Sequence, residues 1–164
     1  MKKLLLDTNI YGLMVADSER KDIHEQLHQG SLLIFGFDVV RKELRDTPKN
    51  ISFQGKDLRI DLLSVYDDLV KKSYSINDQI IGLAENYFLA YRELGGSIAK
   101  TKILNDFLIV ACATLKQMDI VVSDDAHSLL TENALRAYRL TNEIRKIKTP
   151  NFLTYLKFKE MIKT

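Results

Sequence analysis

Three short runs of apolar residues constrain the fold of this 164-residue chain more than any other feature. They cover residues 3–6, 32–37 and 120–122, and each stops abruptly at a polar turn. Polar and apolar residues do not alternate within them, which is typical of short strands buried on both faces of a parallel sheet. A fourth, weaker strand with an edge-like pattern is predicted over residues 144–148, just before Pro150.

Segments with helical spacing separate these runs. Apolar residues recur at helical intervals, and capping or stop signals bound the segments, over residues 39–46, 56–72, 78–94, 102–117 and 152–162. Strands that alternate with helices predict an α/β fold with right-handed crossovers. We therefore expect a three-layer α/β/α architecture around a central, mostly parallel sheet of four to five strands. The chain shows no internal repeat and no long linker, so we expect a single domain over residues 1–164.

Composition excludes several classes of protein. A single cysteine excludes a disulfide framework and a cysteine-based zinc finger. The longest apolar run is far shorter than the ~20 residues of a membrane-spanning helix. Three leucines before Asp7 are also too few for the apolar region of a signal peptide, which needs about seven. We therefore expect a cytoplasmic protein that does not associate with a membrane.

Positive charge gathers in the last part of the chain. Residues 136–164 contain eight bases and two acids, a net charge of +6, which leaves −4 for residues 1–135. This asymmetry is compatible with a polyanionic partner such as RNA, and equally with solvated basic faces on terminal elements. The candidates for contact with an RNA backbone are Arg136, Arg139, Arg145, Lys146 and Lys148.

Acidic residues follow two of the predicted central strands. Asp7 comes directly after the first strand, and Asp124 and Asp125 follow the strand over residues 120–122. Ligands of parallel sheets bind at the carboxyl ends of such strands. An aspartate after a strand also stabilises turns and caps helices, and for any one of these residues alone that role is the simpler interpretation.

Two more acids lie beside apolar helix faces. Asp106 has Ile103, Ile109 and Val110 as its helical neighbours, and Glu43 is flanked by the apolar stripe of its own helix. An unpaired carboxylate in such a place is costly, so it normally takes up a proton or pairs with a cation. A salt bridge is one solution, with the nearby bases Arg41, Lys42, Lys100 and Lys102 as possible partners.

A divalent metal ion is the other solution, because it would allow all four acids to share one site. Oxygen ligands alone favour Mg²⁺ or Mn²⁺ over zinc. His24 and His28 are four residues apart on a possible helix, but the sequence suggests no third ligand, so a zinc site there is disfavoured. A hard metal held by carboxylates typically activates water or binds a phosphate during hydrolysis.

Five segments in this order resemble the PIN-domain family, especially VapC-type toxin ribonucleases and archaeal single-domain PIN proteins. They span nearly the whole chain: residues 4–9, 39–44, 105–113, 120–125 and 148–153. The resemblance implies a metal-dependent endoribonuclease that prefers single-stranded RNA and is commonly a homodimer. It also raises the possibility of an antitoxin protein as partner.

The resemblance assigns roles to the acids. Asp7, Glu43, Asp106 and Asp125 would be catalytic and would hold one or two Mg²⁺ or Mn²⁺ ions. Asp125 lies two residues after the hydroxyl residue, as the family pattern requires, but the adjacent Asp124 is an alternative ligand.

Three polar residues are expected to orient the acids or water, namely Thr8, Asn9 and Ser123. Stabilisation of the first turn explains Thr8 and Asn9 equally well. The chain departs from the family pattern in two respects: Ser123 stands where threonine is commoner, and residues 50–96 are longer and more helical than in compact toxins.

Two other classes of function remain as alternatives. A haloacid-dehalogenase-like phosphatase would need a second aspartate where this chain has Asn9. A non-catalytic PIN-like module that binds RNA or a protein could retain the same acids.

Overall fold

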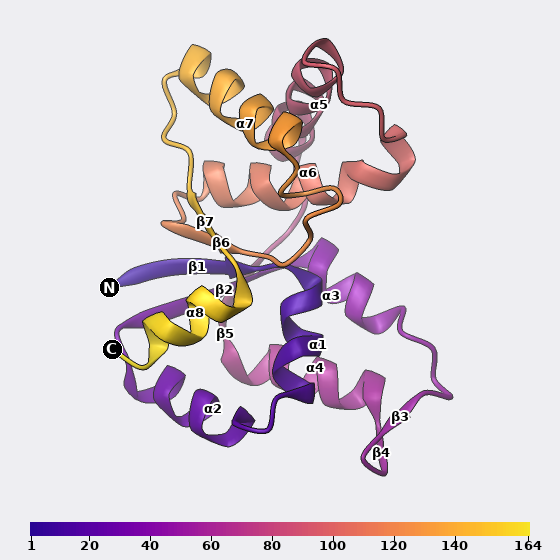
Figure 1. Cartoon of the computed structure of the whole chain (residues 1–164), viewed down its shortest axis with the longest axis vertical. Coiled ribbons are helices and arrows are strands. Elements are labelled where there is room, and N and C mark those ends of the chain that lie inside the picture. The colour runs from indigo at the N-terminus through magenta and orange to yellow at the C-terminus, as the bar shows by residue number, and fades with distance from the viewer.

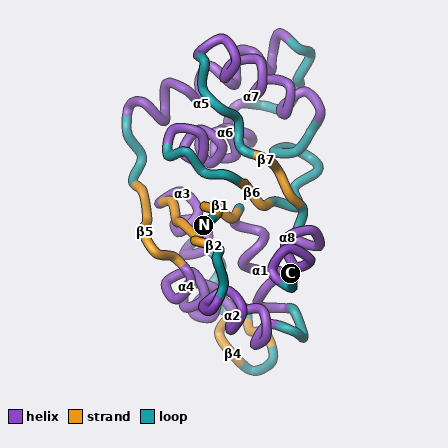
Figure 2. Tube along the Cα trace, turned by 90° about the vertical axis from the view of Figure 1, so that its left-hand side faces the viewer, coloured by secondary structure: helices purple, strands orange, loops and turns teal.

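A computed structural model describes all 164 residues, and its centre is a five-stranded parallel sheet (Figure 1). Across the sheet the strand order is β5-β2-β1-β6-β7, as Figure 2 shows from the side on which both termini lie. The strands are β1 (Lys2–Leu6), β2 (Leu32–Phe37), β5 (Val70–Tyr74), β6 (Ile120–Val122) and β7 (Asn151–Leu153). The predicted parallel sheet is confirmed, and β1 lies at its centre.

Helices cover both faces of the sheet, which gives the predicted three layers (Figure 1). One layer contains α5 (Asp78–Glu93), α6 (Lys100–Leu115) and α7 (Glu132–Arg145). The other contains α1 (Thr8–Ala16), α2 (Arg20–Gln29), α4 (Leu58–Leu69) and α8 (Tyr155–Ile162). The short helix α3 (Asp38–Arg45) follows β2 and contacts helices of both layers, α1 and α4 on one side and α6 on the other.

Burial on both faces explains why the central strands carry no alternating pattern. Leu4, Leu5 and Leu6 in β1 are almost completely buried. Leu5 pairs with Phe35 of β2 on one side and with Val121 of β6 on the other. The leucines in the second half of β1 are therefore covered on both faces of the sheet, whereas Lys2 at the start of the strand is exposed.

The prediction of a strand over residues 144–148 is wrong. Helix α7 continues to Arg145, Ile144 is 74% exposed on it, and Lys146 ends the helix with a left-handed backbone at φ 59°. Strand β7 begins only at Asn151, after Pro150, and pairs with β6. The apolar residues of 144–148 therefore belong to a helix end and its exit loop. The terminal helix is also shorter than predicted, because Phe152 belongs to β7.

The helix predicted over residues 56–72 is too long at both ends. Lys56–Asp57 form β4, which pairs with β3 (Ser52–Phe53), and the Asp57 carboxylate caps α4 by accepting the Ile60 N–H at 3.1 Å. At the other end Val70 starts β5, an edge strand with exposed lysines that has no continuous apolar run. The helices α1 and α7 had no clear counterpart in the sequence patterns.

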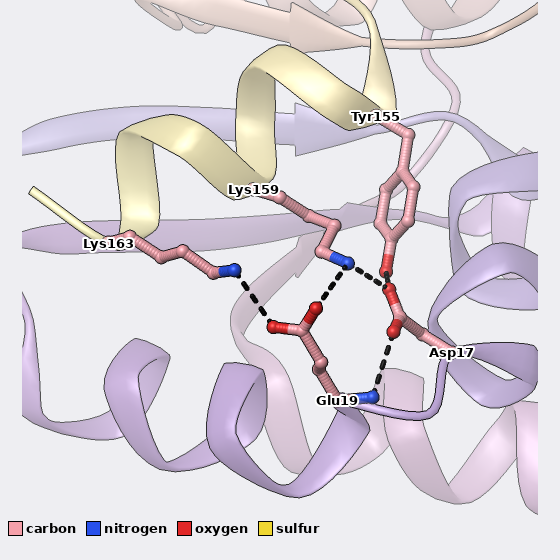
Figure 3. A network of polar contacts seen from close by, with 5 residues as sticks. All are labelled: Asp17, Glu19, Tyr155, Lys159 and Lys163. Atoms are coloured by element: carbon pink, nitrogen blue, oxygen red, sulfur yellow. Dashed lines mark hydrogen bonds and ion pairs between the residues drawn. The ribbon is translucent and has the colours of Figure 1, made fainter.

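A network of polar contacts fastens the C-terminal helix α8 to the turn between α1 and α2 (Figure 3). Asp17 accepts hydrogen bonds from the Tyr155 hydroxyl at 2.7 Å and from the Lys159 ammonium at 2.8 Å. Glu19 pairs with Lys159 at 3.5 Å and with Lys163 at 2.8 Å. Burial alone would raise the pKa of Asp17, but these donors and the Glu19 N–H lower it to about 2.

No helix of the structure combines the length and the apolar character needed to span a membrane.

Candidate metal centre

Three of the predicted acids converge at the carboxyl ends of the central strands. Asp7 directly follows β1, Asp125 follows β6 by three residues, and Asp106 projects from α6. One carboxylate oxygen from each lies within 4.8 Å of the others. We call these three residues the carboxylate trio.

Asp7 is held rigidly, because both of its carboxylate oxygens accept hydrogen bonds. The Ser123 hydroxyl donates to one oxygen at 2.7 Å and the Thr8 N–H to the other at 2.8 Å. Asp7 is only 5% exposed, and burial raises its pKa against the effect of these two donors. Ser123 and Thr8 thus occupy the orienting positions predicted for them, although their role in function remains a prediction.

Ser128 bridges the other two acids of the trio. Its hydroxyl lies 2.5 Å from an oxygen of Asp106 and 2.5 Å from an oxygen of Asp125. A hydroxyl donates only one proton, so one of the two carboxyl groups must keep its own proton for both contacts to form. The other Asp125 oxygen accepts the backbone N–H groups of His127 and Ser128, both at 3.0 Å. The sequence interpretation missed Ser128, whose only signal is its position three residues after Asp125, where a turn can form.

Burial and the neighbouring carboxylates disfavour the ionised form of Asp106. Burial, first, and then the charges of Asp7, Asp125 and Glu43 raise its pKa to about 7, although the hydrogen bond from Ser128 opposes the rise. Like charges held this close favour a cation or a retained proton.

The salt bridges that the sequence left open do not form. Arg41 pairs with Asp67, Lys42 with Asp46, and Lys100 with Glu85. No lysine or arginine forms an ion pair with a member of the trio or with Glu43. The charge of the cluster is therefore not neutralised by the protein.

Glu43 lies beside the trio and not within it. The Thr8 hydroxyl donates to a Glu43 oxygen at 3.0 Å, while the N–H of the same Thr8 binds Asp7. Burial, and to a lesser degree the charge of Asp7, raises the pKa of Glu43. Thr8 thereby links the two acids.

Asp124 points elsewhere, which resolves the choice between the two adjacent acids in geometric terms. Its carboxylate accepts the backbone N–H of Tyr155 at 2.7 Å, at the start of α8, and the residue is exposed. Asn9 accepts the Asp124 N–H at 3.5 Å. The structure therefore brings Asp125 into the trio and places Asp124 and Asn9 in a structural contact outside it.

The five basic residues predicted to contact RNA are all exposed, but they do not form one surface. Arg136 and Arg139 lie within the first eight residues of α7, which begins shortly after the loop of Asp125. Lys146 and Lys148 line a hollow with Asp119, which precedes β6, so they lie toward the amino end of that strand. The trio lies at the opposite edge of the sheet.

No protein-family model and no curated protein sequence matches the chain. Solved structures do match in fold. VapBC2 from Rickettsia felis bound to a promoter DNA fragment matches with a TM-score of 0.59 and 15% identity, over 93% of this chain and 98% of that one. VapBC-1 from nontypeable Haemophilus influenzae matches with a TM-score of 0.58 and 16% identity, over 94% of this chain and 98% of that one. FitAB bound to the IR36 DNA fragment matches with a TM-score of 0.58 and 14% identity, over 93% of this chain and 94% of that one.

Proposed function

We propose, from the PIN-like fold that the chain shares with these structures, that it is a metal-dependent endoribonuclease that hydrolyses RNA phosphodiester bonds. We further propose that it is the toxin of a toxin–antitoxin pair. One observation carries the enzymatic part of the proposal. Three carboxylates converge within 4.8 Å at the ligand-binding edge of the sheet, and no basic side chain neutralises them.

The residues of the trio fit a hard divalent cation. Asp7, Asp106 and Asp125 offer oxygen atoms only, which favours Mg²⁺ or Mn²⁺ over softer metals. Glu43 would contribute directly or through water. When bound, such an ion lowers the pKa of a coordinated water and stabilises negative charge on the attacked phosphate.

The surrounding hydroxyl groups prepare the acids for this role. Ser123 and Thr8 hold Asp7 in one orientation, and Ser128 holds Asp106 against Asp125. Because the pKa of Asp106 is about 7, this group keeps a proton over much of the neutral range in the absence of a cation. A cation that binds to the trio has to displace that proton, so we expect the affinity of the trio for the cation to increase as the pH rises through 7.

The exposed bases on α7 supply a route to the RNA backbone. Arg136 and Arg139 are exposed within the first eight residues of α7, whose N-terminal end adjoins the loop of Asp125. Contacts to phosphate give affinity that depends on salt and not on sequence. We assign this role first to Arg136 and Arg139, and only a long RNA would reach Arg145, Lys146 and Lys148.

The assembly is part of the proposal. The matching structures are VapBC and FitAB complexes, which supports an antitoxin protein as partner. Leu89 of α5 and Leu140 and Ile144 of α7 line one hollow and are 63%, 44% and 74% exposed. Uncovered apolar surface of this kind supports a homodimer. Light scattering of the protein and of an Ile144→Asp variant tests this, with a monomeric variant as the expected result.

RNA cleavage by a matched pair of variants tests the enzymatic proposal. Labelled single-stranded RNA is incubated with and without Mn²⁺ and with the wild type, Asp125→Asn or Asp124→Asn. We expect Mn²⁺-dependent cleavage by the wild type and by Asp124→Asn, and a loss of at least about 100-fold in Asp125→Asn. If none of the three cleaves RNA and all three bind it equally, the chain is a non-catalytic PIN-like module.

A further inference from the structure

A second convergence of metal-ligating side chains lies away from the carboxylate trio. It consists of His24 and His28 on α2 and Asp68 on α4, and one ligand atom from each lies within 4.8 Å of the others. His28 lies four residues before β2 and Asp68 two residues before β5, so the cluster is near the amino edge of the sheet. The trio occupies the opposite edge. The sequence alone suggested no third ligand beside the two histidines, and in the structure Asp68 takes this position.

Two helices present these side chains on facing surfaces. On α2 the buried residues Ile23 and Leu27 pack into the core and leave the face with His24 and His28 turned toward α4. One turn earlier on this face, Arg20 makes two hydrogen bonds to Asp61 of α4, at 2.9 and 3.0 Å. Asp61 precedes Asp68 by seven residues, or two helical turns, so both acids share one face of α4.

The ligand atoms point at a common position. The Nε2 atoms of both imidazoles approach the same oxygen of Asp68, with the His28 contact at 2.9 Å. The two rings lie 5.3 Å apart between centroids. In a tetrahedral zinc site with metal–ligand bonds near 2.0–2.1 Å, ligand atoms lie about 3.3 Å from one another. A small outward movement of these three atoms is enough to admit an ion between them.

We propose that His24, His28 and Asp68 form a site for one divalent metal ion, and that this ion is Zn²⁺. Two imidazoles and one carboxylate suit Zn²⁺, whereas the all-oxygen trio suits Mg²⁺ or Mn²⁺. The three side chains are 29%, 43% and 52% exposed, so water can reach the fourth position of the ion. The bound ion fastens α2 to α4 beside the Arg20–Asp61 pair.

Zn²⁺ binding to the chain without an added histidine tag tests the proposal. Calorimetric titration is carried out in an Asp106→Asn background, which removes one of the three carboxylates of the other centre and so weakens metal binding there. We expect one Zn²⁺ per chain, and we expect His28→Asn and Asp68→Asn each to weaken binding by at least about tenfold. His127→Asn is the matched control, because His127 is the only other histidine, and it should bind Zn²⁺ as the background does.

Two further readouts keep the test decisive. In the wild-type background, His28→Asn should retain the Mn²⁺ affinity of the trio, which shows that the fold is intact. The proposal is overturned if the Asp106→Asn protein binds no Zn²⁺ in a one-to-one ratio. It is also overturned if His28→Asn and Asp68→Asn bind Zn²⁺ as tightly as their background, since the cluster would then be hydrogen bonds alone.

Discussion

Replacing Asp106 with asparagine should stabilise the metal-free protein above neutral pH. Burial and the neighbouring charges of Asp7, Asp125 and Glu43 disfavour the ionised form of Asp106, which is why its pKa is raised to about 7. In the unfolded chain the same group titrates near 3.8. The folded state therefore holds a proton that the unfolded state has released, and stability falls as the pH rises between these values. Asparagine carries no charge and escapes this cost.

The size of the effect follows from the two pKa values. Each pH unit between 3.8 and about 7 costs the folded wild type up to about 1.4 kcal/mol, for a ceiling of about 4 kcal/mol above pH 7. Asp106 is partly exposed, so water and counterions screen part of the cost, and we expect about 2 kcal/mol. The asparagine can still accept the hydrogen bond from Ser128, so little is lost in exchange.

Urea unfolding in EDTA at a series of pH values measures this difference. The free energy of unfolding of Asp106→Asn, minus that of the wild type, should increase from pH 4 to pH 7 and then stay constant. A difference that does not change with pH, or a variant less stable than the wild type at pH 8, would refute the electrostatic reasoning.

Three further changes have defined outcomes. Ser128→Ala should keep the fold but weaken Mn²⁺ binding by about tenfold, measured by calorimetry, because Asp106 and Asp125 lose the hydroxyl group that bridges them. Gly36→Ala should lower the free energy of unfolding by about 1–3 kcal/mol in urea titrations, because the added methyl group would overlap the buried Tyr66 hydroxyl. Tyr155→Phe should lower the free energy of unfolding by about 1.5–3 kcal/mol at pH 7, because the charge-assisted hydrogen bond to Asp17 is lost. Because the pKa of Asp17 is about 2, this difference should diminish as the pH falls from 4 toward 2.

The buried part of the sheet could be predicted from the sequence. The strand β6 and the last three residues of β1 are apolar without interruption because both of their faces are covered, so their composition alone predicts them. The edge strand β5 has no such signal, since Lys71 and Lys72 are exposed and only its pairing with β2 defines it. The strand predicted before Pro150 failed for a related reason: a few apolar residues at a helix end resemble a short strand.

The candidate site was predictable where chemistry is tied to strand ends. Asp7 and Asp125 lie together because parallel strands end at the same side of the sheet, and Asp106 joins them because the first half of α6 lies near those strand ends. Side-chain orientation was not predictable. Adjacency in sequence leaves Asp124 and Asp125 indistinguishable, and what separates them is the hydrogen bond that Asp124 accepts from Tyr155, 31 residues away.

Ligands contributed by distant segments were missed. Asp68 approaches His24 and His28 only because α2 and α4 pack together, and no local pattern encodes that contact. Net charge was likewise a poor guide to position, because Lys146 and Lys148 lie toward the opposite edge of the sheet from the trio.

Calorimetric titration of Mn²⁺ into three proteins tests most directly whether the carboxylate trio is a metal centre. The proteins are the wild type, Asp106→Asn and the matched surface variant Asp124→Asn. We predict that the wild type and Asp124→Asn bind Mn²⁺ alike, and that Asp106→Asn binds it at least about tenfold more weakly. Equal affinity in all three proteins would contradict the assignment of the metal to the trio.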